Sequence, residues 1–346
     1  MKVLITGNMG YVGPAVVAHL RHEHPDWTID GFDSGYFAHC LTAAEELPER
    51  LVDRQIFGDV RDIVPGMFEG YDGLVQLAAI SNDPMGNQFA AVTQAINCTS
   101  AAAIARAAQT AGVKSMVYAS SCSVYGIADG PRSEADPVAP LTAYAKSKVE
   151  AEQAFEHLGG TMLTTCLRFA TACGMSDRLR LDLVVNDFVA SAIASDEITI
   201  LSDGTPWRPL IDVRDMALAI EWALLREEAD GGRNLVVNAG SQQSNYRVLE
   251  VAEAVATVRP GVTINVNSSA PADSRSYQVN FDRFAQLAPN HQPRIGLTRS
   301  IEGLVDGLER MSFADSDFRN SAMVRLRVLN DHLASGRLSP DLRWRP

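Results

Sequence analysis

The sequence predicts an α/β fold in which a doubly wound parallel sheet of the Rossmann type is followed by a smaller C-terminal α/β subdomain. Two observations lead to this prediction. Short apolar runs alternate with helical patterns along the first half of the chain, which is typical of repeated βα units. The first apolar run also breaks into a glycine-rich turn just where a helix should begin. The 346 residues, 46% of them hydrophobic, are enough to bury one large core.

The glycine-rich turn lies in residues 2–13, KVLITGNMGYVG, after a buried strand of Val3, Leu4 and Ile5. Gly7 permits a tight turn, Gly10 lets the backbone approach a pyrophosphate, and Gly13 lets the next helix pack close to the sheet. The N-terminus of that helix then faces the anion. A purely structural turn is the alternative on these residues alone. We expect this loop to contact a dinucleotide through Gly7, Met9, Gly10, Tyr11, Val12 and Gly13.

Asp33 supports the dinucleotide interpretation. It lies 20 positions after Gly13, at the end of a second strand-like run from Thr28 to Phe32. A carboxylate at this position accepts hydrogen bonds from the ribose hydroxyls of adenosine. Because it would repel a phosphate on that ribose, the sequence favours NAD over NADP.

The following elements continue the alternation of strands and helices. Val12, Val16 and Leu20 recur at helical spacing, and Pro14 is tolerated because it falls in the first helical turn. Residues 34–50 form an irregular excursion before a third strand at Arg54 to Phe57.

Asp59 and Val60 follow the third strand and are expected to contact the cofactor. Asp59 is placed to meet the adenine amino group, and capping of the turn that begins at Arg61 is an equally good interpretation.

A fourth strand covers residues 74–79, and its last residues, Leu77, Ala78 and Ala79, would let the cofactor lie against the backbone. A long helix over 91–111 carries Asn97, and a fifth strand covers 113–119. In a sheet of this kind, ligands bind beyond the carboxyl ends of the strands.

The chemistry of the chain lies directly after the fifth strand. The run Ser120 to Gly126, SSCSVYG, occupies the mouth of the sheet, and Tyr144 and Lys148 follow on a helix over 141–157. Their i, i+4 spacing puts both side chains on one face, so the ammonium group can stabilise a tyrosinate. An ordinary tyrosine has a pKa near 10, and neutrality requires a decrease of about 3 units, or about 4 kcal/mol.

The tyrosinate would act as general base on a sugar hydroxyl while a hydride leaves the same carbon for NAD. Ser121 would hydrogen-bond the same oxygen. The catalytic candidates are therefore Ser121, Tyr144 and Lys148, and Ser120 and Asn97 join Tyr144 and Lys148 among the cofactor contacts. An exposed helix with a solvated lysine is the alternative, and the position one helix after a serine cluster argues against it.

These motifs resemble the extended short-chain dehydrogenase/reductases, specifically the NAD-dependent nucleotide-sugar epimerases and dehydratases. The resemblance implies that Leu167, Arg168 and Phe169 form a family strand, that Asn186 binds the substrate diphosphate, and that Arg208 clamps it. It also implies a homodimer that packs the helices containing Asn97 and Tyr144 against their symmetry mates. Arg275 is a candidate phosphate ligand in an irregular stretch, with a surface ion pair as the alternative. The substrate-binding candidates are Ser81, Ser121, Cys122, Ser123, Tyr144, Thr171, Asn186, Arg208 and Arg275.

Departures from the family pattern reduce the number of reaction types that the chain could catalyse. Sugar 4,6-dehydratases carry acidic residues after the serine or threonine, whereas this chain has Cys122 and Ser123 there. The related 3,5-epimerases carry a cysteine where this chain has Ser123. Strand alternation turns Cys122 away from the pocket, so a buried core thiol is favoured over a catalytic one. The machinery that remains is that of a 4-epimerase. A dehydrogenase, ketoreductase or dehydratase of a nucleotide sugar is the alternative, and a non-catalytic NAD-binding regulator is a remote one.

The second half of the sequence is interpreted as the substrate lid. We expect residues 1–172 to bind NAD and residues 173–346 mainly to bind the nucleotide-diphosphate sugar, with parts of 198–240 returning to the sheet. Helices are predicted over 181–194, 214–227 and 246–258, strands over 198–201 and 235–237, and a loop over 203–212. Arg178 and Arg180 alternate with leucines and are predicted to lie in a basic loop, with a second anion contact as the alternative. The tail from residue 312 is expected to pack as a closing helix without chemistry.

Composition excludes several other classes of protein. The formal net charge of −12 disfavours nucleic acid, which needs a basic surface. The five cysteines form no CxxC pair or zinc-ligand spacing, so no metal site is expected and the thiols are expected to be reduced. No apolar run reaches membrane-spanning length, and Met1 leads directly into a strand without a secretory leader. We therefore expect a cytoplasmic protein without membrane contacts.

Overall fold

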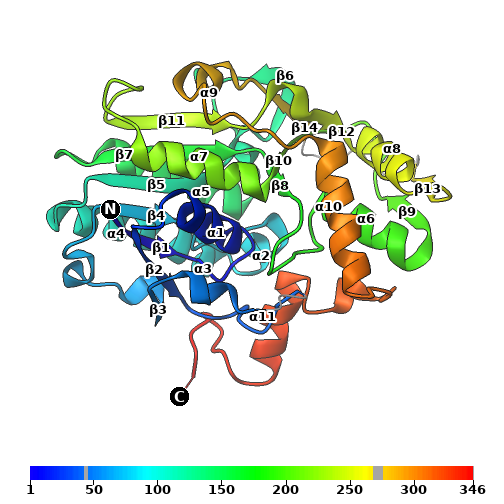
Figure 1. Ribbon diagram of the computed structural model, residues 1–346, viewed down its shortest axis with the longest axis horizontal. Coiled ribbons are helices and arrows are strands. Elements are labelled where there is room, and N and C mark those ends of the chain that lie inside the picture. The colour runs from blue at the N-terminus through cyan, green and yellow to red at the C-terminus, as the bar shows by residue number, and fades with distance from the viewer. Residues whose placement is uncertain (43–45, 268–275, 346) are drawn as a thin grey trace.

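The centre of the computed structural model is a seven-stranded parallel sheet, which confirms the predicted α/β fold (Figure 1). The structure describes residues 1–42, 46–267 and 276–345. All pairings between neighbouring strands of this sheet are parallel. The spatial order is β11 (Asn234–Ala239), β7 (Leu163–Phe169), β5 (Ser115–Ser121), β4 (Gly73–Gln76), β1 (Lys2–Thr6), β2 (Thr28–Asp33) and β3 (Arg54–Phe57).

Strand β1 lies at the point where the order of the sheet reverses. It pairs with β2 on one side and with β4 on the other, and later strands extend the sheet outward from β4. A crevice forms at such a point because the connections on either side leave it in opposite directions. The glycine-rich turn after β1 therefore begins at the place in the sheet where ligands bind.

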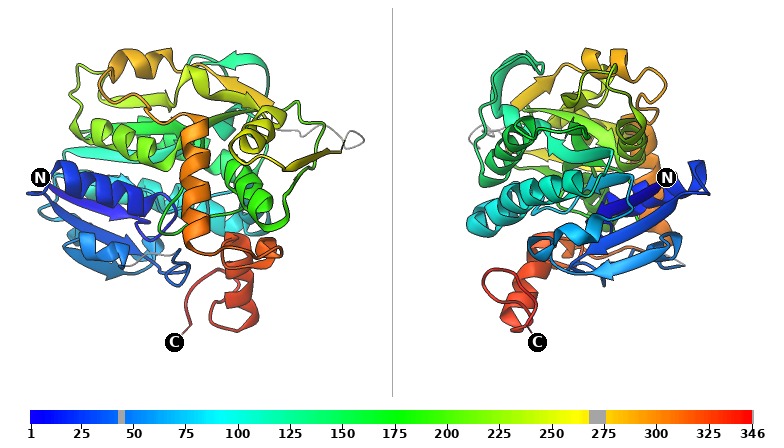
Figure 2. Two further views of the ribbon diagram at one scale, coloured as in Figure 1. Left: turned by 45° about the vertical axis from the view of Figure 1, so that its right-hand side comes forward. Right: turned by 90° about the vertical axis from the view of Figure 1, so that its left-hand side faces the viewer.

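Helices cover both faces of the sheet (Figure 2). The packing of β1 shows why both faces are apolar, since successive residues point to opposite sides. Val3 and Ile5 pack in one core cluster with α1 (Gly13–Glu23) and α7 (Val213–Leu225). Leu4 packs in a second cluster with side chains of α4 (Ala101–Thr110) and α5 (Ala143–Glu156). Burial on both faces explains why the strands appear in the sequence as short continuous apolar runs.

The helix predicted over 91–111 is formed by consecutive segments rather than by one regular helix. α3 (Ala90–Gln94) and α4 are joined by a π-helical segment, Ala95–Ser100, that contains Asn97. Single π-helical turns within α-helices often mark functional positions.

In the described residues, three smaller sheets are formed mainly by the second half of the chain. One has the order β12 (Asn245–Arg247), β10 (Trp207–Asp212) and β8 (Thr171–Cys173). The two others pair β13 (Thr263–Val266) with β9 (Glu197–Ile200), and β14 (Ser276–Val279) with β6 (Ile127–Arg132). The remaining helices are α2 (Asp83–Gln88), α6 (Val184–Ser195), α8 (Val248–Val258), α9 (Asp282–Leu287), α10 (Leu297–Arg310) and α11 (Arg325–Ala334).

The prediction of a loop over 203–212 is wrong, because β10 occupies its second half. Pro209 favoured a loop, since proline cannot donate to a strand ladder. The structure accommodates it where β10 changes partner. Residues 207–209 pair with β12, and residues 210–212 pair with β8.

Among the described residues, no helix combines the length and the apolar character needed to span a membrane.

Candidate active site

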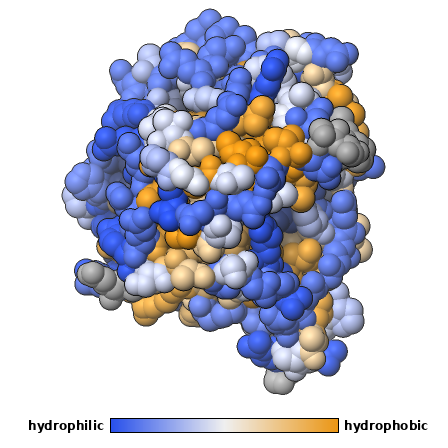
Figure 3. All heavy atoms as spheres, turned by 90° about the vertical axis from the view of Figure 1, so that its right-hand side faces the viewer, coloured by the Kyte–Doolittle hydropathy of each residue, from blue (hydrophilic) through white to orange (hydrophobic). Residues whose placement is uncertain are grey.

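A cavity of about 1200 Å³ runs along the carboxyl ends of the central strands. Ligand pockets in proteins usually have volumes of about 300–1,000 Å³, so this cavity can hold more than one small ligand. Figure 3 shows the side of the molecule that lies at the right of Figure 1, where apolar side chains gather in the middle of a polar surround. The lining includes residues at or just after the ends of six strands, namely Gly7, Asp33, Gly58, Leu77, Ser121 and Phe169.

The glycine-rich loop has the geometry of an anion cradle. Gly7 has a φ of 80°, and a Cβ built on it would lie 2.5 Å from the backbone nitrogen of Ala78. A Cβ on Gly13 would lie 2.1 Å from the carbonyl oxygen of Asn8. In contrast, a Cβ on Gly10 would contact only the Gly7 oxygen, at 3.1 Å, and Gly10 lines the cavity. The first and third glycines therefore permit close packing, and the second keeps the cavity open beside the N-terminus of α1.

Asp33 lines the cavity at the end of β2 and is held by two backbone N–H groups. The amide of Met9 donates to its Oδ2 at 3.0 Å, and the amide of Gly35 donates to its Oδ1 at 2.8 Å. Burial raises the pKa of Asp33, and these two hydrogen bonds oppose that rise. Met9 itself is buried and does not line the cavity, so the structure gives its expected direct cofactor contact no support and shows instead a backbone contact that positions Asp33.

Asp59 caps the turn that follows β3, as one of its two interpretations predicted. Its side chain accepts from the Arg61 backbone N–H at 2.8 Å and from the Arg61 guanidinium at 2.5 to 3.0 Å. Asp59 also lines the cavity, so its position is compatible with the other interpretation, a contact with the adenine amino group. The other residues predicted on this side, Tyr11, Val12, Val60, Leu77, Ala78 and Ala79, line the cavity as well.

Asn97 does not line the cavity, and the prediction of a direct cofactor contact is not supported. Its Oδ1 accepts from the Ile80 backbone N–H at 2.9 Å, while its Nδ2 donates to the Ile80 carbonyl and to the Ser147 hydroxyl. Ile80 lines the cavity, and Ser147 lies on α5 between Tyr144 and Lys148. The amide therefore ties the loop after β4 to the helix with the tyrosine and lysine.

Ser121, Tyr144 and Lys148 all line the cavity. The Lys148 ammonium lies 5.6 Å from the centroid of the Tyr144 ring and 4.4 Å from that of Tyr118. It donates to the Ala119 carbonyl at 2.7 Å. Burial lowers the pKa of Lys148 to about 7, and the nearby Glu152 carboxylate opposes this decrease. The predicted shared face of Tyr144 and Lys148 is therefore present at the mouth of the sheet.

A buried ionic network lies below this site and was not predicted from the sequence. Glu152 forms an ion pair with Arg168 at 2.7 Å and accepts from the Ser120 hydroxyl at 2.5 Å. Arg168 also donates to the Tyr125 hydroxyl at 3.0 Å. Glu152 is one helical turn after Lys148, and this spacing was the available sequence signal. Ser120 lines the cavity, but its hydroxyl is directed into this network.

Cys122 and Ser123 differ in position. Cys122 is buried and does not line the cavity, and its thiol donates to the Arg168 carbonyl at 3.0 Å. Burial raises its pKa well above the usual range. The predicted burial of the thiol is therefore confirmed, but Cys122 lies in the short 3-10 helix Cys122–Tyr125 that follows β5 and not in the strand itself, and the structure gives no support to its place among the substrate candidates. Ser123 lines the cavity, and within the described part of the chain its buried hydroxyl has no hydrogen-bond partner.

The remaining substrate candidates fall into three groups. Ser81, Thr171 and Arg208 line the cavity. Asn186 does not, because its fully buried amide donates to the Tyr11 hydroxyl at 2.9 Å and to the Arg180 carbonyl at 2.8 Å. Its proposed contact with a diphosphate is therefore not supported by the structure. Arg275 lies outside the described residues.

Arg180 lies in a loop, as predicted, and this loop lines the cavity, which keeps the alternative of an anion contact open for this residue. It is buried, forms an ion pair with Asp182 at 2.8 Å and donates to the Ser81 hydroxyl at 2.8 Å. Arg178 is buried too, in an ion pair with Glu49 at 2.5 Å.

Residues 3–240 match the model of the NAD dependent epimerase/dehydratase family. The chain belongs to this family.

Proteins similar to this chain include epimerases and dehydratases, the two kinds of enzyme in the family name. A UDP-glucose 4-epimerase of Corynebacterium glutamicum is 29% identical over 271 residues, which is 73% of this chain and 79% of that protein. The structure of MoeE5 in complex with UDP-glucuronic acid and NAD is 26% identical, with a TM-score of 0.76, and covers 90% of this chain and 99% of that one. TunA, an NAD-dependent NDP-hexosamine 5,6-dehydratase, shares the fold at 20% identity and a TM-score of 0.77, covering 91% and 99%.

NAD is the cofactor of this family, and the residues of the cavity fit it. The open space at Gly10 beside a helix N-terminus suits a diphosphate. Asp33 offers a carboxylate already fixed by two amides. Among the described residues, no group of His, Cys, Asp and Glu side chains could hold a metal ion.

Replacing Asp33 with alanine should weaken NAD binding about 10-fold to 100-fold and reduce discrimination against NADP. Hydrogen bonds to a charged group contribute about 1.5–3 kcal/mol, and each 1.4 kcal/mol is a factor of ten. Calorimetric titration with NAD and with NADP measures both effects. Asp53→Ala is the control, because this exposed carboxylate lies before β3, outside the cavity lining. Unchanged cofactor preference in Asp33→Ala would refute the ribose role.

Proposed function

We propose that the chain is a nucleotide-sugar 4-epimerase in which Tyr144 is the general base. One observation carries this proposal: Ser121, Tyr144 and Lys148 line one cavity, while the positions after Ser121 hold a buried thiol and a serine hydroxyl. The cavity thus has the groups needed to oxidise and reduce one carbon. It lacks, at these positions, an acid that could remove a neighbouring proton and expel a hydroxyl group.

The proposed reaction keeps all atoms of the sugar. Tyr144 removes the proton from the C4 hydroxyl, and Ser121 donates a hydrogen bond to the same oxygen. Bound NAD supplies the hydride acceptor and a positive charge beside the phenol. The 4-keto sugar would rotate in the cavity so that its opposite face could be reduced by the bound cofactor, and Tyr144 would return the proton to the oxygen. Ser123, whose hydroxyl is otherwise unpartnered among the described residues, is available to a sugar hydroxyl.

The ionisation of Tyr144 sets a condition on this mechanism. Burial raises its pKa to about 12, whereas a hydrogen bond from the Ser121 side chain and the Arg180 guanidinium lower it. Lys148, with a pKa of about 7, is only partly protonated at neutral pH. The chain's own residues therefore leave the phenol protonated, and the additional positive charge has to arrive with the ligands. The tyrosinate form of Tyr144, which is the general base, therefore forms only when the ligands are bound.

The proposed substrate is a nucleotide-diphosphate sugar. MoeE5 binds UDP-glucose and UDP-glucuronic acid, and Arg208, which the family resemblance assigns to the diphosphate, lines the cavity of this chain. As part of the proposal, residues 1–172 bind NAD and residues 173–346 mainly bind the sugar nucleotide. We also propose a cytoplasmic homodimer that pairs the helices containing Asn97 and Tyr144.

Incubation with UDP-sugars in heavy water tests the reaction type. A 4-epimerase returns the same hydride to C4, so the product has the mass of the substrate and contains no carbon-bound deuterium. A dehydratase product lacks one water, and a 3,5-epimerase product gains deuterium from the solvent. Mass spectrometry with chromatographic separation of the two sugars distinguishes these results.

Quantification of the dinucleotide released on denaturation distinguishes a 4-epimerase from a dehydrogenase or ketoreductase, which exchanges its cofactor in each turnover. We expect near-stoichiometric NAD, because an epimerase recycles its cofactor in place. Deuterium in the product, loss of water, or stoichiometric reduction of added NAD would overturn the 4-epimerase proposal.

A further inference from the structure

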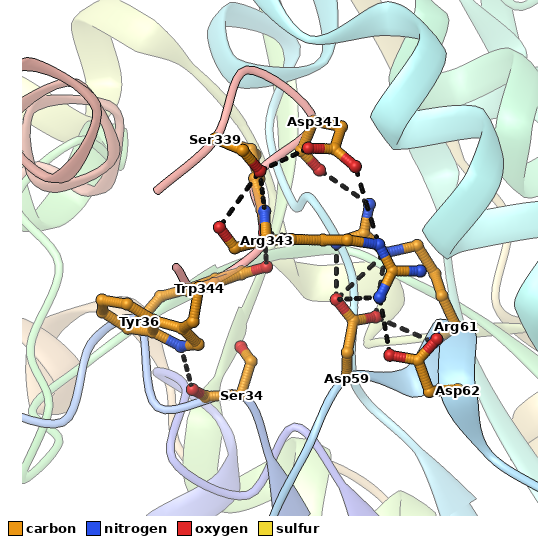
Figure 4. Close-up of polar contacts among 10 residues, drawn as sticks. Ser34, Tyr36, Asp59, Arg61, Asp62, Ser339, Asp341, Arg343 and Trp344 are labelled. Carbon is orange, nitrogen blue, oxygen red and sulfur yellow. Dashed lines mark hydrogen bonds and ion pairs between the residues drawn. The ribbon is translucent and has the colours of Figure 1, made fainter. Parts of the chain in front are cut away.

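The C-terminal residues reach the loop that follows β2. We call residues 338–344 the C-terminal strap; they follow α11 and lie at the bottom of Figure 1. The Trp344 indole N–H donates to the Ser34 carbonyl at 2.6 Å, and the Tyr36 hydroxyl donates to the Leu342 carbonyl (Figure 4). Ser34 and Tyr36 line the cavity beside Asp33. The strap therefore fixes one wall of the proposed adenosine site from outside.

The strap also holds the loop that follows β3. The Arg61 guanidinium donates to the carbonyls of Asp341 and Leu342, at 2.7 and 3.2 Å, while it binds the Asp59 carboxylate. Arg343 forms an ion pair with Asp62 at 2.6 Å and lies 3.9 Å from Asp59. Figure 4 shows these side chains converging between the strap and the β3 loop. One segment thus connects the two loops that carry Asp33 and Asp59.

The strap is a folded element with its own internal bonds. Leu338 and Trp344 form an antiparallel bridge, and the Ser339 hydroxyl accepts from the Arg343 backbone N–H at 3.2 Å. Leu338 and Leu342 are buried in a cluster that includes Ile80 and Met85, both of which line the cavity. Burial of these two leucine side chains removes apolar surface from water, so the strap is held by packing as well as by ion pairs.

Arg325, the first residue of α11, places a buried positive charge on the cavity lining. Its side chain donates to the carbonyls of Ala322, Arg178 and Leu179, and the guanidinium lies 4.9 Å from the centroid of the Phe37 ring. Within the described part of the chain, no carboxylate lies within ion-pair distance of it. Burial lowers its pKa to about 10. A buried charge without a counter-ion is unfavourable, so an anion in the adjoining cavity would be stabilised.

We propose that Arg325 and the C-terminal strap form the outer wall of the dinucleotide site and retain NAD. Arg325 acts as a counter-charge for the anionic cofactor, and the strap prevents the loops after β2 and β3 from opening. The tail expected to carry no chemistry is then part of cofactor binding. The inference rests on NAD as the cofactor, not on the identity of the sugar or on epimerisation.

The rate of NAD release from the purified holoenzyme tests this proposal. The protein is diluted into buffer that contains an NAD-consuming trap, and bound NAD is quantified over time after rapid desalting. The double variant Arg343→Ala/Trp344→Ala should release NAD at least about 10-fold faster, since it removes an ion pair and the indole hydrogen bond to the β2 loop. Arg325→Gln should raise the Kd for NAD about 10-fold to 100-fold and reduce its salt dependence.

Matched variants distinguish an effect on NAD retention from an effect on protein folding. Arg327→Ala removes an exposed arginine on the same helix and should leave release unchanged. Arg325→Lys keeps the charge and should retain more NAD than Arg325→Gln at equal thermal stability. Release rates that stay at the parent value in correctly folded Arg343→Ala/Trp344→Ala and Arg325→Gln would overturn the proposal. So would equal loss of NAD in Arg325→Lys and Arg325→Gln, because it would indicate packing alone. A failure of 4-epimerisation leaves this measurement intact, since no sugar is added.

Discussion

Replacement of Tyr144 by phenylalanine should reduce turnover about 10³-fold or more while bound NAD remains near the parent level. A positioned acid or base contributes about 10²–10⁴-fold to a rate, and the proposed reaction uses Tyr144 both to remove and to return the proton. The ring remains in Tyr144→Phe, so the Lys148 ammonium keeps its aromatic neighbour. Measuring kcat with a UDP-sugar and NAD content after denaturation gives both quantities.

The control for this variant is Tyr246→Phe, which removes a phenolic hydroxyl from β12, outside the cavity lining. It should leave kcat within about twofold of the parent. Substantial turnover in Tyr144→Phe would rule out this residue as the base. Loss of NAD from the same variant would instead indicate that the phenol is needed to bind the cofactor.

Replacement of Glu152 by alanine should lower the free energy of unfolding by about 3–5 kcal/mol, because it leaves the Arg168 guanidinium buried without its counter-ion. Arg168 is 7% exposed and Glu152 is 6% exposed, so water replaces little of the lost interaction. The Ser120 hydroxyl loses its acceptor as well. Because Glu152 holds the pKa of Lys148 up, the variant should also lower that pKa.

Urea unfolding monitored by circular dichroism measures the change in stability. Glu156→Ala, at the exposed end of the same helix, should change it by less than about 0.5 kcal/mol. The double variant Glu152→Leu/Arg168→Leu should recover much of the loss, because it removes both charges. If Glu152→Ala were as stable as Glu156→Ala, the pair would not be an important buried interaction.

The parts of the fold that depend on local pattern were predictable from the sequence. The apolar run before Gly7, the helix after Gly13 and the i, i+4 spacing of Tyr144 and Lys148 report local geometry, and the structure agrees with each. The predicted burial of Cys122 is also correct, although the residue begins a 3-10 helix after β5 and does not belong to the strand. What the sequence could not supply were contacts between distant segments.

The errors show this limit residue by residue. Asn186 and Asn97 matched expected polar positions, but their amides are used by backbone and hydroxyl groups far away in sequence. Arg180 was predicted to lie in a loop, and only the packing of that loop against the cavity reveals that its side chain is buried. Pro209 suggested a loop because its place between two strand partners depends on tertiary pairing.

The hydrogen bond between Trp344 and Ser34 has a consequence for how the protein folds, since it joins residues 310 positions apart. Contacts of such separation require closure of a very long loop, and proteins that depend on them fold slowly. The central sheet can form from neighbouring βα units before this contact exists. We therefore expect the strap to dock after the sheet has formed, and a cofactor that binds only the closed form to stabilise the docked strap.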